Sequence, residues 1–100
     1  MIIRMIIYDI ESDPLRTKFS KKLEALGFIR MQYSVFCGSH PDHQWKYCKE
    51  QIDKVLSKKM GDHDKVDILR LGKIQLKKMD SLGLAADFEY ILSPPDVLWI

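Results

Sequence analysis

The chain has 100 residues, of which 46% are hydrophobic and 30% are charged. This composition predicts one compact domain, because so apolar a chain can offset the entropy lost on folding, whereas half its length would not bury a core. The apolar runs are far shorter than the roughly 18 residues that cross a bilayer, so no membrane span is expected. Arg4 and Asp9 interrupt the opening stretch, which argues against a signal peptide there. Two cysteines without paired spacing favour a reducing cytoplasm over a disulfide framework.

The net charge of +2 hides an uneven distribution. All sixteen Lys and Arg residues fall within positions 1–78, where they outnumber ten acidic residues. Positions 79–100 carry four acidic residues and no basic one. This division indicates a basic body that can face phosphate groups, followed by an acidic, apolar tail that contacts something else. An uneven sampling of surface charge with no functional meaning explains the same numbers and stays open.

The first part of the chain predicts a strand, a helix and a second extended stretch. Residues 1–10 are apolar at both alternating sets of positions, which is typical of a strand in the middle of a sheet. Residues 12–14, with the sequence Ser-Asp-Pro, form a helix start, and Gly27 ends a helix with apolar positions at helical spacing. Residues 28–37 alternate again and predict one long strand that Gly38 ends.

The second part predicts another helix, a strand and shorter pieces. Residues 39–42 open a helix, and its core-facing stripe is predicted to consist of Trp45, Cys48, Ile52, Val55, Leu56 and Met60. Residues 66–71 predict a strand, residues 73–79 a short helical turn, and residues 88–92 a last short strand.

This order of elements predicts an α+β fold, a ferredoxin-like βαββαβ two-layer sandwich with an appended C-terminal strand. Two amphipathic helices must then cover the same face of one sheet. The architecture also needs two strands before the second helix. We therefore expect residues 28–37 to break near positions 32–34, although no local turn signal marks the break.

The sheet face without helices is predicted to be apolar whichever way the first strand points. The two alternatives for that face are Ile2, Ile6 and Tyr8 or Ile3, Met5 and Ile7. Such a patch marks an interface, and a two-fold homodimer covers it with a single kind of chain. The alternative is that residues 88–100 fold back over it.

Asp9 is the acid that the sequence singles out, because it ends an apolar strand where a carboxylate has no structural reason to lie. A turn or helix-cap role explains it as well. One carboxylate makes a poor Mg²⁺ site, although a dimer axis near Asp9 would double it. His40 and His43, with Cys37 and Cys48 nearby, lack the ligand pairs of a zinc site.

The segment Tyr8-Asp9-Ile10, followed by Arg16 and Lys18 and then by Arg30-x-Gln32-Tyr33-Ser34-Val35-Phe36-x-Gly38, has a specific spacing. It resembles the small endoribonuclease-type protein of the CRISPR adaptation module, the second Cas protein family. The resemblance covers residues 1–72 and implies a ferredoxin-like, dimeric protein. Residues 1–79 would be the nuclease-type domain, and residues 80–100 a C-terminal strand and tail for dimer or partner contact.

The resemblance also implies a site. Asp9 would be the catalytic and metal-binding residue, lying close to its symmetry mate so that the pair holds Mg²⁺ or Mn²⁺ in the dimer cleft. The residues that would line or shape this nucleic-acid-binding cleft are Arg16, Lys18, Arg30, Ser34 and Phe36. Two alternatives stay open: Phe36 packs in an interface, and Arg30 pairs with Asp9 or Glu11. Glu11 or Asp13 would add a carboxylate near the metal.

Three functions follow from these residues and from the resemblance. The first is metal-dependent endonuclease activity, the hydrolysis of phosphodiester bonds in RNA or DNA at paired Asp9 residues. The second is a non-catalytic homodimer for spacer acquisition, which bridges the CRISPR integrase subunit and binds DNA on its basic surface. The third is a toxin-like ribonuclease of the same fold. In the first two, the tail is expected to add a strand to the partner copy or to contact the integrase.

Overall fold

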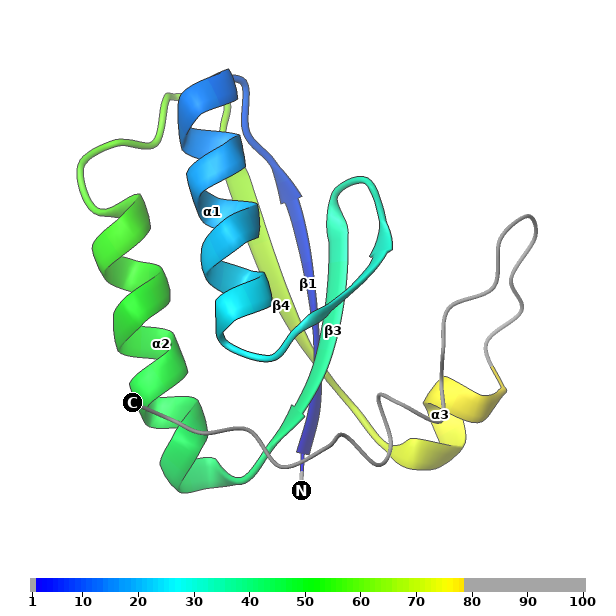
Figure 1. Cartoon of the computed structure of the whole chain (residues 1–100). Helices are drawn as coiled ribbons and strands as arrows, with labels where there is room; N and C mark the ends of the chain where they lie inside the picture. The colour runs from blue at the N-terminus through cyan, green and yellow to red at the C-terminus, as the bar shows by residue number, and fades with distance from the viewer. Residues whose placement is uncertain (1, 79–100) are drawn as a thin grey trace.

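The computed structural model describes residues 2–78 (Figure 1). Their elements in chain order are β1 (Ile2–Asp9), α1 (Asp13–Ala25), β2 (Ile29–Gln32), β3 (Val35–His40), α2 (Asp42–Leu56), β4 (Lys65–Leu71) and α3 (Lys73–Lys77). The order of the first six elements confirms the predicted ferredoxin-like βαββαβ sandwich. The strand predicted over residues 88–92 and the tail lie outside the described residues.

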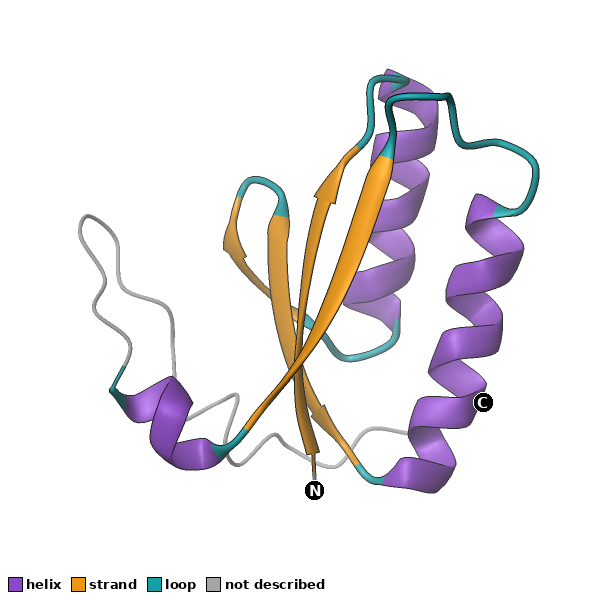
Figure 2. Cartoon of the chain, turned by 180° about the vertical axis from the view of Figure 1, so that it is seen from behind, coloured by secondary structure: helices purple, strands orange, loops and turns teal. Residues whose placement is uncertain are grey.

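The described strands form one sheet in the order β2-β3-β1-β4, with every neighbouring pair antiparallel. β1 is central, as its apolar residues on both faces predicted. Helices α1 and α2 lie side by side over one face, and the view from behind shows the other face without them (Figures 1 and 2). None of the described helices has the length and apolarity needed to cross a bilayer.

The stretch 28–37 breaks where the architecture required. β2 ends at Gln32, the chain turns at Tyr33 and Ser34, and a register irregularity follows Arg30 in the β2–β3 pair. The prediction that Gly38 ends the strand is wrong, because β3 continues to His40. A Cβ atom on Gly38 would lie 2.7 Å from the Phe28 ring, so this glycine makes room for an aromatic side chain inside the strand.

Both long helices follow the local chemistry of their ends. The Ser12 hydroxyl accepts a hydrogen bond from the Leu15 N–H at 3.3 Å and caps α1, and Gly27 follows with a φ of 89°. α2 begins after Pro41 and buries Cys48, Ile52 and Val55, with Trp45 and Leu56 packed at the margin. Met60 was wrongly assigned to this stripe. Because α2 ends at Leu56, Met60 lies in the following loop and is 38% exposed.

The main core lies between the two helices and the sheet. Tyr8 is buried there, with its ring edge-on to Phe19 at 4.9 Å and stacked on Phe36 at 6.2 Å between centroids. The other residues of this core include Ile6, Leu15, Leu23, Phe28, Cys48 and Ile52. Each large apolar side chain that is fully buried contributes roughly 1.5–3 kcal/mol relative to an exposed one. These contacts fix the orientation of β1.

The opposite face of the sheet is called the open face below, and from β1 it carries Ile3, Met5, Ile7 and Asp9. Leu76 of α3 packs on one end of it, against Ile3 and Cys37. The other end keeps apolar side chains exposed, with Ile7 at 37% and Leu69 at 47%. The open face therefore carries the second of the two predicted sets, Ile3, Met5 and Ile7. Only part of the predicted apolar surface is exposed, because Leu76 covers one end.

Arg4 is a buried charge at the far end of β1 from Asp9. It is 4% exposed, its guanidinium lies 4.2 Å from the centre of the Trp45 ring, and its Nη2 lies 3.5 Å from the Asp42 Oδ1. Burial lowers the pKa of Arg4, and the partner Asp42 opposes this. These contacts join the start of β1 to the first turn of α2.

Candidate functional site

Asp9 is the last residue of β1 and its side chain is exposed on the open face, in the row that contains Ile7. Its cross-strand neighbour is Lys65 of β4. The Lys65 ammonium lies 3.2 Å from the Asp67 Oδ2, so Asp9, Lys65 and Asp67 form a charged rim at this end of the open face. The exposed Ile7 and Leu69 adjoin this rim.

The described part of one copy, residues 2–78, contains no group of three or more His, Cys, Asp or Glu side chains placed to hold a metal ion. Of the two nearby acids expected to help, Asp13 pairs with Arg16. Glu11 is exposed in the loop after β1, and its backbone N–H donates to Asp64. Because Mg²⁺ needs several oxygen ligands, the Asp9 carboxylate by itself is an incomplete site.

Asp67 is a residue of this rim that the sequence reasoning missed. Ile7 is directly opposite Asp67, and Asp9 is directly opposite Lys65, so Asp67 is the diagonal neighbour of Asp9 on the same face. The alternation of residues 65–71 places Asp67 in the same row as Leu69, but only the register of β4 with β1 places Asp67 beside Asp9.

A second feature is a polar pocket of about 200 Å³ on the helix side of the sheet. We call it the arginine pocket, and it is lined by Tyr8, Arg16, Thr17, Ser20, Arg30 and Tyr33. Arg16 comes from α1, Arg30 from β2 and Tyr33 from the turn between β2 and β3. The sequence prediction placed both arginines in one cleft with Asp9. The structure brings the arginines together but leaves Asp9 on the opposite face of the sheet.

Both arginines have hydrogen-bond and ionic partners within the chain. Arg16 Nη1 donates to the Ile10 carbonyl at 2.9 Å, and Arg16 Nη2 pairs with Asp13, whose hydrogen bond raises the pKa of Arg16. Arg30 Nη1 donates to the Tyr33 carbonyl at 2.6 Å. Arg30 Nη2 lies 3.9 Å from Glu24 rather than near Asp9 or Glu11, so the alternative pairing expected for Arg30 is wrong.

The remaining predicted cleft residues lie elsewhere. Phe36 is fully buried in the main core and lines no surface, although its ring supports the Arg30 guanidinium at 4.8 Å. Ser34 contributes a backbone carbonyl, which accepts the Tyr8 N–H at 3.1 Å. Lys18 lines a different pocket together with Lys59, and the nearby Lys18 lowers the pKa of Lys59.

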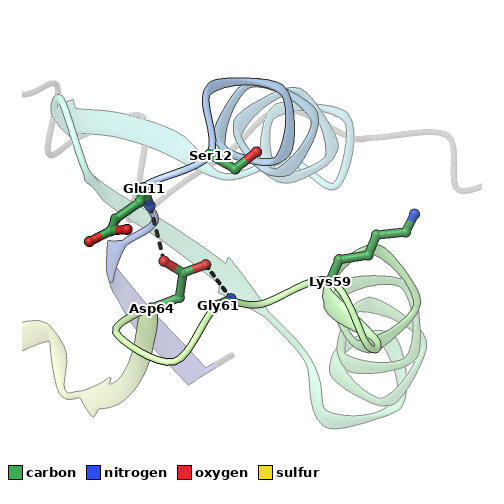
Figure 3. Close-up of a pocket in the computed structure, with 5 residues that line it drawn as sticks. All are labelled: Glu11, Ser12, Lys59, Gly61 and Asp64. Carbon is green, nitrogen blue, oxygen red and sulfur yellow. Dashed lines mark hydrogen bonds between the residues drawn. The ribbon is translucent and has the colours of Figure 1, made fainter.

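A third pocket, of about 360 Å³, lies between the loop after β1 and the loop after α2 (Figure 3). Its central group is the Asp64 carboxylate, which accepts hydrogen bonds from the Glu11 N–H at 3.0 Å and the Gly61 N–H at 2.8 Å. These two bonds lower the pKa of Asp64. Figure 3 shows the Lys59 side chain pointing away from Asp64. Asp64 therefore acts as a structural link between two loops near the Asp9 end of β1.

A four-stranded antiparallel sheet with two helices on one face and an acid at the end of its central strand defines a small ferredoxin-like domain. The family model described as CRISPR associated protein Cas2 matches residues 1–79 of this chain. The chain therefore belongs to the Cas2 family, as the motif resemblance indicated.

Individual relatives agree with this assignment. A curated protein of Korarchaeum cryptofilum (strain OPF8), named CRISPR-associated endoribonuclease Cas2, is 29% identical over 80 residues, which cover 79% of this chain and 82% of the relative. The crystal structure of Streptococcus pyogenes Cas2 has a TM-score of 0.64 at 21% identity and covers 81% of this chain and 99% of its own. A hypothetical protein from Thermus thermophilus has a TM-score of 0.68 at 21% identity, over 85% and 94% of the two chains. The two structures show the same fold.

Proposed function

We propose that this protein acts in CRISPR adaptation as a homodimer that binds nucleic acid and bridges the integrase subunit. The observation that carries the proposal is the end of the open face that residues 2–78 leave uncovered, where Ile7 and Leu69 are exposed and Asp9 ends the same row. A second copy on this surface would bury the apolar side chains and bring two Asp9 carboxylates to one axis.

At that axis, the paired Asp9 residues would hold Mg²⁺ or Mn²⁺, with Asp67 of each copy as a neighbouring carboxylate. A bound metal ion supplies positive charge that favours phosphodiester hydrolysis. The printed name of the Korarchaeum relative, an endoribonuclease, supports RNA as the substrate of such an activity. We therefore propose metal-dependent endonuclease activity, carried by Asp9, as the catalytic function.

A non-catalytic scaffold is the second candidate, and the arrangement of charges favours it. Each chain brings one Asp9 to the open face, whereas Arg16 and Arg30 lie on the other side of the sheet. Exposed lysines of α1, among them Lys18 and Lys21, add positive charge that suits a nucleic-acid backbone. The family match favours both of these functions over a toxin-like ribonuclease.

Several parts of the proposal come from the sequence. Residues 80–100 follow the segment matched by the family model, and we propose that they contact the second copy or the integrase. A cytoplasmic location is proposed from the two unpaired cysteines, which are both buried.

The experiment is Asp9→Asn, compared with Asp62→Asn in the exposed loop after α2. Each variant is assayed with Mg²⁺ and with EDTA for cleavage of RNA and DNA, and for spacer integration with the integrase. Loss of cleavage and of metal dependence in Asp9→Asn alone supports the paired-aspartate site. Cleavage retained by Asp9→Asn contradicts it. If neither the wild-type protein nor any variant cleaves nucleic acid while spacer integration is normal, the protein acts as a non-catalytic scaffold.

A further inference from the structure

We infer that the arginine pocket takes one unpaired nucleotide of a single-stranded nucleic acid, with its phosphate facing Arg16 and Arg30 and its base stacked on Tyr33. The inference rests on the proposed function, because it assumes a nucleic-acid ligand and names the form of that ligand. It assigns a role to Tyr33.

Tyr33 is an exposed aromatic side chain on a fixed piece of backbone. Its side chain is 70% exposed, although it lies in a two-residue turn between paired strands. Its carbonyl accepts hydrogen bonds from Arg30 Nη1 at 2.6 Å and from the Tyr8 hydroxyl at 3.4 Å. A large ring that costs free energy to expose, held on an anchored turn, suits a surface that stacks against a flat ligand.

Two positive charges flank this ring. The guanidinium carbons lie 5.9 Å from the ring centre for Arg16 and 6.0 Å for Arg30, although the two side chains come from different elements. The Asp13 and Glu24 carboxylates that pair with them are 82% and 57% exposed, so a phosphate can replace such surface partners at little cost. The planar guanidinium then binds phosphate through paired N–H groups.

The lining of the pocket agrees with an anionic ligand. Besides the two arginines, it is lined by the hydroxyl-bearing residues Tyr8, Thr17, Ser20 and Tyr33, and none of its six lining residues is acidic. The Tyr8 and Ser20 hydroxyls donate to backbone carbonyls, so the arginines are the main donors toward an anion. Its volume of about 200 Å³ lies below the 300–1,000 Å³ of typical small-molecule sites. It therefore holds part of a nucleotide, and the base lies outside it against the exposed face of Tyr33.

The requirement for an unpaired base follows from stacking. A base in a duplex already stacks on its neighbours, whereas a base in a single strand can be splayed out onto a tyrosine. Phosphate and base are common to RNA and DNA, so this geometry does not distinguish the sugar. The pocket is thus predicted to distinguish single strands from duplexes.

The test measures fluorescence anisotropy of labelled ten-nucleotide single strands, oligo-rU and oligo-dT, and of a duplex with the same number of phosphates. Tyr33→Ala is expected to weaken binding of a single strand by about tenfold, since one base–aromatic stack contributes roughly 1–3 kcal/mol. Tyr33→Trp should restore it, because the indole also stacks. Tyr47→Ala, which removes an exposed tyrosine from α2 outside the pocket, is the matched control. Thermal unfolding confirms that each variant is folded.

Equal losses on single strands and duplex, or no loss in Tyr33→Ala, would overturn the inference. Wild-type protein that binds the duplex but no single strand would also overturn it, while leaving the proposed function intact. Wild-type protein that binds neither overturns both. If Tyr33→Ala weakens the binding of oligo-rU more than that of oligo-dT, the pocket prefers RNA, and the reverse result indicates DNA. Either result supports the inference.

Discussion

Tyr8 and Asp9 are consecutive residues of β1 whose side chains lie on opposite faces of the sheet. Tyr8 is buried under the helices against Phe19 and Phe36, and it reaches the arginine pocket. Asp9 lies on the open face beside Lys65. These two consecutive residues therefore serve two different surfaces. One surface carries arginines suited to phosphate, and the other carries an acid next to exposed apolar side chains.

Ile7→Lys is predicted to weaken the homodimer, because it places a charge among the apolar side chains that a second copy would cover. We expect the dimer dissociation constant from analytical ultracentrifugation to rise by at least about tenfold, since an unpaired charge in such a contact costs more than 1.4 kcal/mol. Met60→Lys is the matched control, since Met60 is 38% exposed and Ile7 is 37% exposed. If the two substitutions raise the dimer dissociation constant equally, or if neither raises it, the open face is not the interface.

The two cysteines are predicted to be inert in the folded protein. Burial raises the pKa of the Cys37 and Cys48 thiols to about 11, so very little reactive thiolate exists at pH 8. Reaction with an aromatic disulfide reagent should be slower than for an exposed cysteine by on the order of a hundredfold. Both thiols should react at once in denaturant. Rapid labelling of native protein would show that one of the two sites opens easily.

Asp42→Asn is predicted to lower the free energy of unfolding by on the order of 1 kcal/mol, because it leaves the Arg4 guanidinium buried without its ionic partner. The matched control is Asp53→Asn, which removes an ion pair with Lys49 at 2.8 Å on the surface of α2. That pair contributes about 0.3–0.5 kcal/mol. Urea unfolding measures the free energy of unfolding of both variants. Equal losses would mean that the burial of Arg4 does not strengthen its ion pair with Asp42.

Asp64→Asn is predicted to destabilise the protein at neutral pH and to lose this effect in acid. The hydrogen bonds from Glu11 and Gly61 hold the pKa of Asp64 below its ordinary value, so the unfolded chain binds a proton first as the pH falls. The contribution of Asp64 is thus complete above about pH 4 and disappears as the pH falls through the lower folded pKa. Thermal unfolding midpoints of both proteins from pH 7 to pH 2 check this. A difference that stays constant with pH would contradict it.

The elements were predictable from the sequence wherever local chemistry decides them. Ser12, Pro14 and Gly27 mark the ends of α1 as predicted, and the apolar alternation of β1 predicts its central place. The break in residues 28–37 was predictable from the architecture alone, because Tyr33 and Ser34 carry no strong turn signal. Gly38 was misread because its role depends on Phe28, which approaches it from another part of the chain.

The site was predictable only in part, because strand alternation separates residues that a motif places side by side. The motif joined Asp9, Arg16, Arg30 and Phe36 into one cleft, whereas folding sends Asp9 to the open face and buries Phe36. Asp67 was missed because its proximity to Asp9 depends on the register of β1 with β4, which no local pattern encodes. Tyr33 was not predictable as a stacking residue, because Arg16 and Arg30 come together beside its ring only in the folded chain.

The pairing of Asp9 across a homodimer is tested most directly by disulfide trapping of Asp9→Cys. The two native thiols are buried, so an exposed cysteine at position 9 reports on its own symmetry mate. Mild oxidation should convert most of the Asp9→Cys protein into a covalent dimer on a non-reducing gel. Glu50→Cys, at an exposed position of α2, should stay monomeric on the same gel. Asp9→Cys protein that stays monomeric under these conditions, or crosslinks no faster than Glu50→Cys, would contradict the paired site.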